Sequence, residues 1–220
     1  MEQQEFKKIN VNVNDYISQV YLHLFLGLFL TGIFSYLSYA SGLTLKIASL
    51  GALAFVGLFF LILILVIAQY FAAKNVALSA FLYYLFSILE GVFISPIFYA
   101  YTGSDISLAF ILTSLLFLGL WFVAKSNILD LRKYGTIFIV LLIIGVVASI
   151  VNIFLKNSLL ELIITWFLLI VFAGLTIYDL QKLEELAETG NPFIGALSLY
   201  LDLINLFLLI LELIGGKREE

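Results

Sequence analysis

Seven long apolar stretches, separated by short polar segments, form the pattern of this chain of 220 residues. Each has about the 20 apolar residues that a helix needs to cross the hydrocarbon core of a membrane. Each is also about twice as long as a barrel strand and lacks a two-residue alternation, so helices are predicted rather than strands. The predicted spans are Val20–Ala40, Ile47–Ala68, Val76–Tyr101, Ile106–Ala124, Thr136–Leu155, Leu159–Tyr178 and Phe193–Ile214.

Composition places these helices in a membrane. The chain is 63% hydrophobic and only 12% charged, whereas a soluble domain usually has about 25% charged residues. Too few polar groups are present to cover a water-exposed surface, so we expect an all-α integral membrane protein with a seven-helix bundle. The chain divides into a polar N-terminal tail at 1–19, a membrane domain at 20–214 and a charged C-terminal tail at 215–220.

Several functional classes are excluded by what the sequence lacks. It has no cysteine, which excludes disulfides, thiolate metal sites and cysteine nucleophiles. Its net charge of −4 is accompanied by no basic patch for nucleic acid. There is no glycine-rich phosphate loop, no Ser/His/Asp set and no metal-binding motif, so we expect neither an enzyme nor a resident cofactor.

The distribution of lysine and arginine predicts the orientation. With a cytoplasmic N-terminus and seven full spans, seven of these residues face the cytoplasm and four face the other side, the asymmetry expected of cytoplasmic loops. A last segment that dips in and returns would give nine against two. Its 22 apolar residues are long enough to cross, so seven spans are preferred. The cytoplasmic set is Lys7, Lys8, Lys74, Lys125, Arg132, Lys133 and Lys182, and the other is Lys46, Lys156, Lys217 and Arg218.

Asp202 is the most informative polar residue because it lies inside the seventh apolar stretch. A central aspartate costs about 2.5–3.5 kcal/mol on insertion scales. Ser198, Asp202 and Asn205 are spaced by four and three residues, so they share one helix face. Lipid cannot satisfy such a stripe, which predicts that it faces the bundle interior or a water-filled cavity around a central helix. The alternative is a hydrogen-bonded clasp between helices with no transport role.

Asp179 ends the sixth apolar stretch, where a carboxylate at a helix exit is also an ordinary interfacial residue. The short connection at 181–192 makes the sixth and seventh helices antiparallel neighbours. Asp179 and Asp202 meet only if the sixth helix continues past Asp179 or the seventh begins outside the hydrocarbon. The run at 181–188 is rich in helix formers, so we expect continuation, with the pair in the cytoplasmic third of the membrane.

Glu90 is a third carboxylate, near the middle of the third span, and Pro96 follows it. Proline has no N–H, so it frees the carbonyl of Val92 and predicts a kink. Glu90, the freed carbonyl and the kink could together line a cation path. Alternatively, Glu90 is a neutral glutamate in a polar contact and Pro96 only shapes the bundle.

The segments around the two aspartates resemble the transmembrane Bax inhibitor motif family. The resemblance rests on Ala196–Phe207 (ALSLYLDLINLF) and on Tyr178–Lys182 (YDLQK). Gly91–Ile97 (GVFISPI) and Ala148–Phe154 (ASIVNIF) are similar to further family segments on the third and fifth spans. With seven spans over about 200 residues, the likeness covers nearly the whole chain, and the C-terminal motif is its specific part.

The resemblance implies six helices around a central seventh and a pH-sensitive calcium leak in a bacterial plasma membrane. It assigns pH sensing and gating to Asp179 and Asp202. In bacterial relatives an arginine at the end of the second span acts as a latch partner, but Gln69–Asn75 contains none. Either Lys74 substitutes or the latch differs, and Glu90 would then supply a further pore carboxylate.

The hypothesis that follows is a proton-gated cation leak. Two neighbouring carboxylates in a partly dry site resist double ionisation. A shared proton would hold the sixth and seventh helices together, and its loss would let them separate or admit a cation. A hundredfold difference in proton affinity between closed and open forms would shift their ratio about a hundredfold. The opposite pH dependence follows if protonation removes a salt-bridge latch. Calcium prefers oxygen ligands, which Asp179, Asp202 and Glu90 could provide.

Two other functions compete with the leak. Intramembrane aspartyl proteases also place two aspartates on adjacent helices, one after a tyrosine as at Tyr178-Asp179. However, their second site resembles Gly-x-Gly-Asp, and here it reads Leu199–Asp202 (LYLD). A regulatory protein that restrains a membrane protease or a death-pathway partner is the third possibility, with the polar N-terminal tail as its contact.

Overall fold

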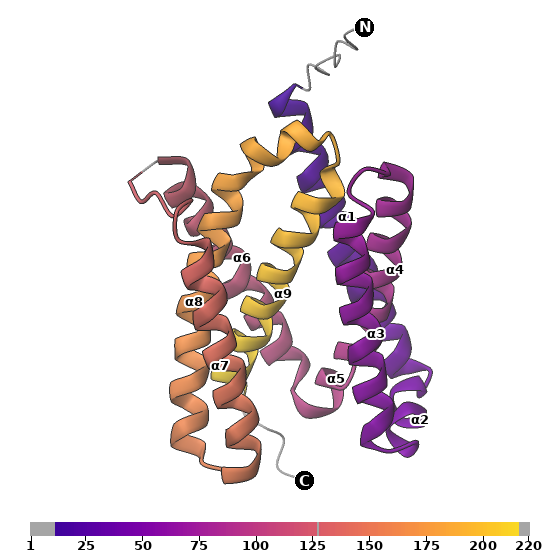
Figure 1. Cartoon of the computed structure of the whole chain (residues 1–220). Coiled ribbons are helices and arrows are strands. Elements are labelled where there is room, and N and C mark those ends of the chain that lie inside the picture. The colour runs from indigo at the N-terminus through magenta and orange to yellow at the C-terminus, as the bar shows by residue number, and fades with distance from the viewer. Residues whose placement is uncertain (1–11, 127, 216–220) are drawn as a thin grey trace, which may run out of the picture.

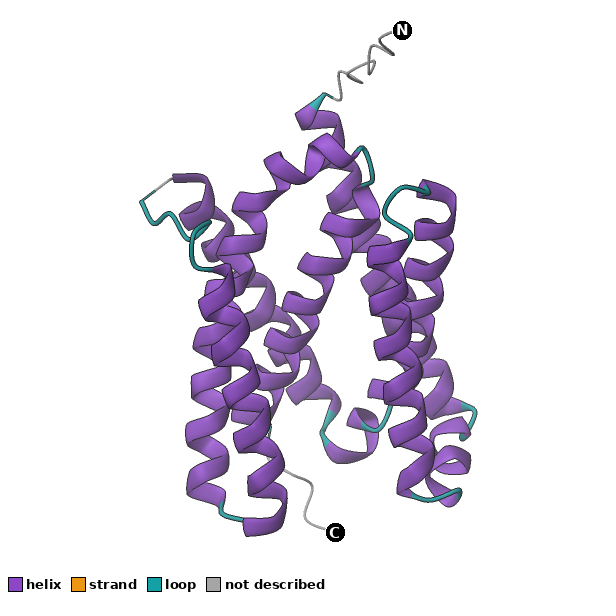
Figure 2. Cartoon of the chain, in the orientation of Figure 1, coloured by secondary structure: helices purple, strands orange, loops and turns teal. Residues whose placement is uncertain are grey.

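The computed structural model describes residues 12–126 and 128–215, and this part of the chain is helical without strands (Figures 1 and 2). Seven of its helices are long and apolar enough to cross a membrane, which confirms the predicted seven-span bundle. The helices are α1 (Val13–Ala40), α2 (Leu43–Ser49), α3 (Ala52–Phe71), α4 (Val76–Ile94), α5 (Ile97–Ala100), α6 (Gly103–Ser126), α7 (Gly135–Leu155), α8 (Ser158–Leu186), η1 (Ala187–Thr189) and α9 (Pro192–Ile214).

The long helices alternate in direction, so the bundle has two ends. We call the end where α1 begins the N-face and the opposite end the far face. The α3–α4 turn, the α6–α7 loop and the α8–α9 connection lie at the N-face, at the top of Figure 1. The last helix, α9, runs without interruption from the N-face to the far face, so a re-entrant end is not formed.

The last helix lies at the centre of the bundle, as predicted. Of its most apolar window 67% is buried, compared with 11–39% for the other six spans. It packs against α1, α4, α6 and α8, whereas α3 packs on α4 and α7 packs on α8. The six surrounding helices therefore form two layers, and only four of them line α9 directly.

Two predicted spans have other boundaries in the structure. The first helix begins at Val13, seven residues before the predicted start at Val20. The predicted second span, Ile47–Ala68, is displaced by a few residues because Leu43–Ser49 forms a separate helix. Gly51 breaks the two apart with a φ of +89°, which other residues rarely adopt. Residues 1–11 and 216–220, which include most of both tails, lie outside the described part.

Candidate functional site

Asp179 and Asp202 come together between α8 and α9. The eighth helix continues to Leu186, well past Asp179, as the prediction required. Asp179 lies 11 residues before Gly190 and Asp202 lies 11 residues after Asn191, so both are about 17 Å from the connection. Their carboxyl groups lie close enough to share a hydrogen bond once one of them carries a proton. We refer to these two residues as the aspartate pair.

Burial makes this contact depend on a proton. Asp202 is only 3% exposed, and its Oδ2 has no hydrogen-bond donor among the described residues. The Thr176 hydroxyl, one turn before Asp179, donates to the Phe172 carbonyl over 2.8 Å and lies near the Asp202 side chain. Ionised carboxylates only accept hydrogen bonds, so two of them cannot bond each other. One proton on the pair supplies the missing donor and removes one of two charges from a buried site.

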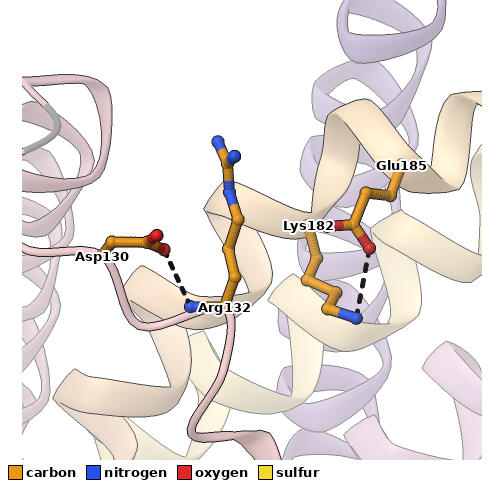
Figure 3. A network of polar contacts seen from close by, with 4 residues as sticks. All are labelled: Asp130, Arg132, Lys182 and Glu185. Carbon is orange, nitrogen blue, oxygen red and sulfur yellow. Dashed lines mark hydrogen bonds and ion pairs between the residues drawn. The ribbon is translucent and has the colours of Figure 1, made fainter.

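The cations nearby are engaged elsewhere. Lys182 acts electrostatically on Asp179 from one turn further along α8. Its Nζ, however, pairs with Glu185 at 3.2 Å and lies 5.4 Å from the centre of the Tyr178 ring. Figure 3 shows this ion pair beside the α6–α7 loop, where the backbone N–H of Arg132 donates to Asp130 over 3.1 Å. Within residues 12–126 and 128–215 no salt bridge to either aspartate is formed.

Gln69, near the end of α3, is a buried polar residue that sequence reasoning missed. It is 2% exposed, and neither its Nε2 nor its Oε1 has a partner in the described residues. The next residue, Tyr70, interacts electrostatically with both members of the pair. Lys74, the predicted substitute for the latch, is instead exposed in the α3–α4 turn. The signal available in the sequence was an amide inside the last apolar turn of the second span.

Glu90 belongs to a second polar cluster, on the other side of α9. The Tyr200 hydroxyl lies 2.6 Å from Thr31 Oγ1, which donates to the Ser87 carbonyl over 2.9 Å. Glu90 is 8% exposed and interacts electrostatically with Tyr200. Two residues along a helix correspond to a rotation of about 200° about its axis. Tyr200 and Asp202 therefore face nearly opposite sides of α9.

The three predicted calcium ligands are consequently not gathered in one place. Among the described residues no group of three or more His, Cys, Asp or Glu side chains lies close enough to hold a metal ion. In this structure Glu90 therefore does not share one cluster with Asp179 and Asp202, and the role of the three residues as calcium ligands stays a prediction. The reason is rotational: α8 supplies one carboxylate on one side of α9, and α4 supplies Glu90 on the other.

Pro96 ends α4 but does not leave a free carbonyl. The helix stops at Ile94, and Ser95 Oγ donates to the Val92 carbonyl over 2.7 Å. The same hydroxyl lies 2.6 Å from Thr44 Oγ1 on α2. The predicted break is present, but the carbonyl expected to line a cation path is already bonded, so Pro96 shapes the far-face end of the bundle.

The polar stripe on α9 is only partly interior. Ser198 and Asn205 are half-buried, whereas Asp202 is buried. Asn205 Nδ2 donates to the Leu201 carbonyl one turn earlier over 2.6 Å. Further along the same helix, Glu212 lines a polar cavity of about 430 Å³ at the far face, together with Glu161 and Asn152. Carboxylates thus lie on α9 at its middle, where Asp202 is, and near its far-face end, where Glu212 is.

Asn191 holds the α8–α9 connection in place, and this connection sets the depth of Asp202 relative to Asp179. It is fully buried, and its Nδ2 donates to the Ala73 carbonyl at 2.9 Å and to Ser79 Oγ at 2.7 Å. Its Oδ1 accepts from the Phe193 N–H over 3.1 Å and caps α9. One side chain therefore joins the start of α9 to the α3–α4 turn.

Comparison with known proteins now decides the family. The family model described as "Inhibitor of apoptosis-promoting Bax1" matches residues 13–219, which is nearly the whole chain and includes both aspartates. The chain belongs to the Bax inhibitor family. The resemblance noted from the motifs at Tyr178–Lys182 and Ala196–Phe207 is thereby confirmed.

Relatives of this Bax inhibitor family member occur in distant bacteria. The inner membrane protein YbhL of Escherichia coli strain K12 is 33% identical over 92% of both chains. An uncharacterized protein of Borreliella burgdorferi is 31% identical over 94% of both chains, and one of Deinococcus radiodurans is 33% identical over 94% of this chain and 92% of its own. Family and fold together make the protein a multi-pass integral membrane protein.

Proposed function

We propose that this Bax inhibitor family protein is a pH-sensitive calcium leak channel whose gate is the aspartate pair. The observation that carries the proposal is the close approach of two carboxyl groups between the central helix and α8, where Asp202 is buried. Such a contact needs a proton, and it joins the helix at the centre of the bundle to one of the four that line it. No covalent chemistry is part of this function.

The sign of the pH dependence follows from counting protons. The closed pair holds one proton, and an open form with separated, hydrated carboxylates holds none. The form that binds more protons is favoured at lower pH, so acid closes the channel and alkali opens it. The opposite sign requires a salt-bridge latch, and no such ion pair to either aspartate is formed in the described part of the chain.

The proposed ion path runs along α9. Calcium takes hard oxygen ligands, and the far-face cavity offers the carboxylates of Glu161 and Glu212 at one end of that helix. The half-buried Ser198 and Asn205 continue the polar side towards the aspartate pair. In this scheme calcium is the transported ion, and the pair with its proton is the barrier about halfway along α9. We propose that Glu90 influences the position of α9 through its electrostatic interaction with Tyr200, and that it does not bind the ion.

Calcium flux through the purified protein in liposomes tests the proposal. With a calcium indicator inside and equal pH on both sides, flux should exceed that of protein-free liposomes and rise between pH 6 and pH 8. A one-proton gate changes the open-to-closed ratio by up to about tenfold per pH unit. Flux equal to that of empty liposomes at every pH would refute the channel. A leak with no pH dependence would remove the gate but leave the channel.

We further propose that the protein lies in a bacterial inner membrane with its N-face in the cytoplasm. Since the chain has no cysteine, single-cysteine variants report the orientation cleanly. An impermeant maleimide applied to intact spheroplasts should label Ser158→Cys, at the far-face start of α8. Ser126→Cys, at the N-face end of α6, should react only after permeabilisation. The reverse pattern would overturn the assigned orientation.

A further inference from the structure

A second cavity, unrelated to the aspartate pair, opens between α1 and α6. Its volume is about 460 Å³, within the range of ligand pockets. Its floor is formed by α9, and its lining is almost entirely apolar. The residues that matter below are Gly32 and Ser35 on α1, Phe110 and Ile111 on α6, and Ile204 and Phe207 on α9.

The cavity exists because α1 and α6 are joined at only one end. At the N-face, Trp121 Nε1 on α6 donates to the Tyr21 hydroxyl on α1 over 3.0 Å. Elsewhere the two helices do not pack closely; both pack instead against α9. The space between them therefore widens towards the far face, where Gly32, Phe110 and Ile111 are exposed at its mouth.

The mouth opens into the hydrocarbon of the membrane rather than into water. Gly32 lies eight residues before the end of α1, and Phe110 seven residues after the start of α6. At 1.5 Å per residue both are about 10–12 Å inside the far-face ends of their helices. Acyl chains of the far-face leaflet occupy this depth.

One buried hydroxyl in the cavity lacks a partner. Thr31 Oγ1 lies 2.9–3.0 Å from both the Ser87 and the Gly27 carbonyls, and the hydroxyls of Ser107 and Thr113 each donate to a carbonyl one turn earlier over 2.7–2.8 Å. Ser35 Oγ is buried and has no hydrogen-bond partner among the described residues. It lies five residues before Ala40, or about 8 Å from the end of α1. A free donor near the interface, beside an apolar slot, matches a chain that begins with a carbonyl.

We propose that this cavity binds one acyl chain of a far-face phospholipid, with its ester carbonyl accepting a hydrogen bond from Ser35. The bound chain lies against Ile204 and Phe207 and so contacts the central helix directly. It also borders Thr31, which holds the Tyr200 hydroxyl. A lipid bound in the cavity therefore contacts α9 on the side opposite to α8 and can affect its position without touching the aspartate pair.

Photo-cross-linking in proteoliposomes tests the site. A phospholipid with a diazirine in one acyl chain should label the cavity walls around Ile111 more strongly than the lipid-facing surface of α7 around Ile143. Gly32→Phe fills the slot, since nothing lies within 4 Å of a Cβ at Gly32, and should reduce wall labelling to the α7 level. Gly119→Phe, at an equally open position on α6, should leave it unchanged.

Ser35→Ala isolates the hydrogen bond. Wild type should prefer a diester over a diether competitor of equal chain length by about three- to tenfold, the range for one neutral hydrogen bond. Ser35→Ala should lose that preference while keeping the label on Ile111. Wall labelling no stronger than that of α7, or unaffected by Gly32→Phe, overturns the proposal. If Gly32→Phe fails to fold, Ile111→Trp blocks the mouth instead. Labelling around Phe110 should then fall to the level of α7, and unchanged labelling there overturns the proposal.

Discussion

Asp202→Asn is expected to hold the channel at its acid level of calcium flux from pH 6 to pH 8. The asparagine amide donates to Asp179 at every pH and so replaces the shared proton that wild type loses as pH rises. Wild type should change by up to about a hundredfold across this interval if opening releases one proton. The measurement is the initial rate of calcium flux in liposomes at each pH.

The matched control for this variant is Glu188→Gln, which removes an exposed carboxylate close to the same helical connection. It should retain the wild-type pH profile. Asp179→Asn should behave as Asp202→Asn does, because either amide supplies the donor. Unchanged flux with unchanged pH dependence in Asp202→Asn would eliminate the aspartate pair as the gate.

Asn191→Ala is expected to lower the free energy of unfolding in detergent by about 3 kcal/mol. The change removes the cap of α9, worth about 1 kcal/mol. It also leaves the half-buried Ala73 carbonyl and the buried Ser79 hydroxyl without their donor, at about 1 kcal/mol each. Reversible denaturation followed by circular dichroism measures the loss.

Asn157→Ala separates the two contributions. Asn157 caps α8 by accepting from the Leu160 N–H over 3.0 Å, but it is exposed at the far face. Its removal should cost only the cap, about 1 kcal/mol. Asn191→Asp should fall between the two, because its carboxylate keeps the cap and loses the donors. Equal losses in Asn157→Ala and Asn191→Ala would show that the buried contacts contribute nothing.

The bundle and its central helix were predictable because they depend on hydrophobicity and segment length. In lipid, each span must form all of its backbone hydrogen bonds internally. Seven apolar stretches therefore become seven helices. The α8–α9 connection is too short for anything but antiparallel neighbours, which brought Asp179 and Asp202 to the same depth. These features need no knowledge of which way any other side chain points.

The composition of the site was less predictable because it depends on helix rotation and on contacts distant in sequence. The sequence of the third span does not predict whether Glu90 faces Tyr200 or Asp202. The burial of Gln69 reflects the neighbours of α3, which periodicity does not specify. The start of α3 was displaced because Gly51 forms a turn inside an apolar run, where hydropathy alone continues the helix.

The equal spacing of the two aspartates from their connection has a consequence for how the protein is made. Helices α8 and α9 form a hairpin whose carboxyl groups reach the same membrane depth when the hairpin enters as a unit. Separately, each aspartate would carry its own insertion penalty of about 2.5–3.5 kcal/mol. With one proton between them, the hairpin enters with one charge fewer. A one-residue insertion within α9, between Pro192 and Asp202, would rotate Asp202 by about 100° about the helix axis and cancel that benefit before the protein ever faced a change in pH.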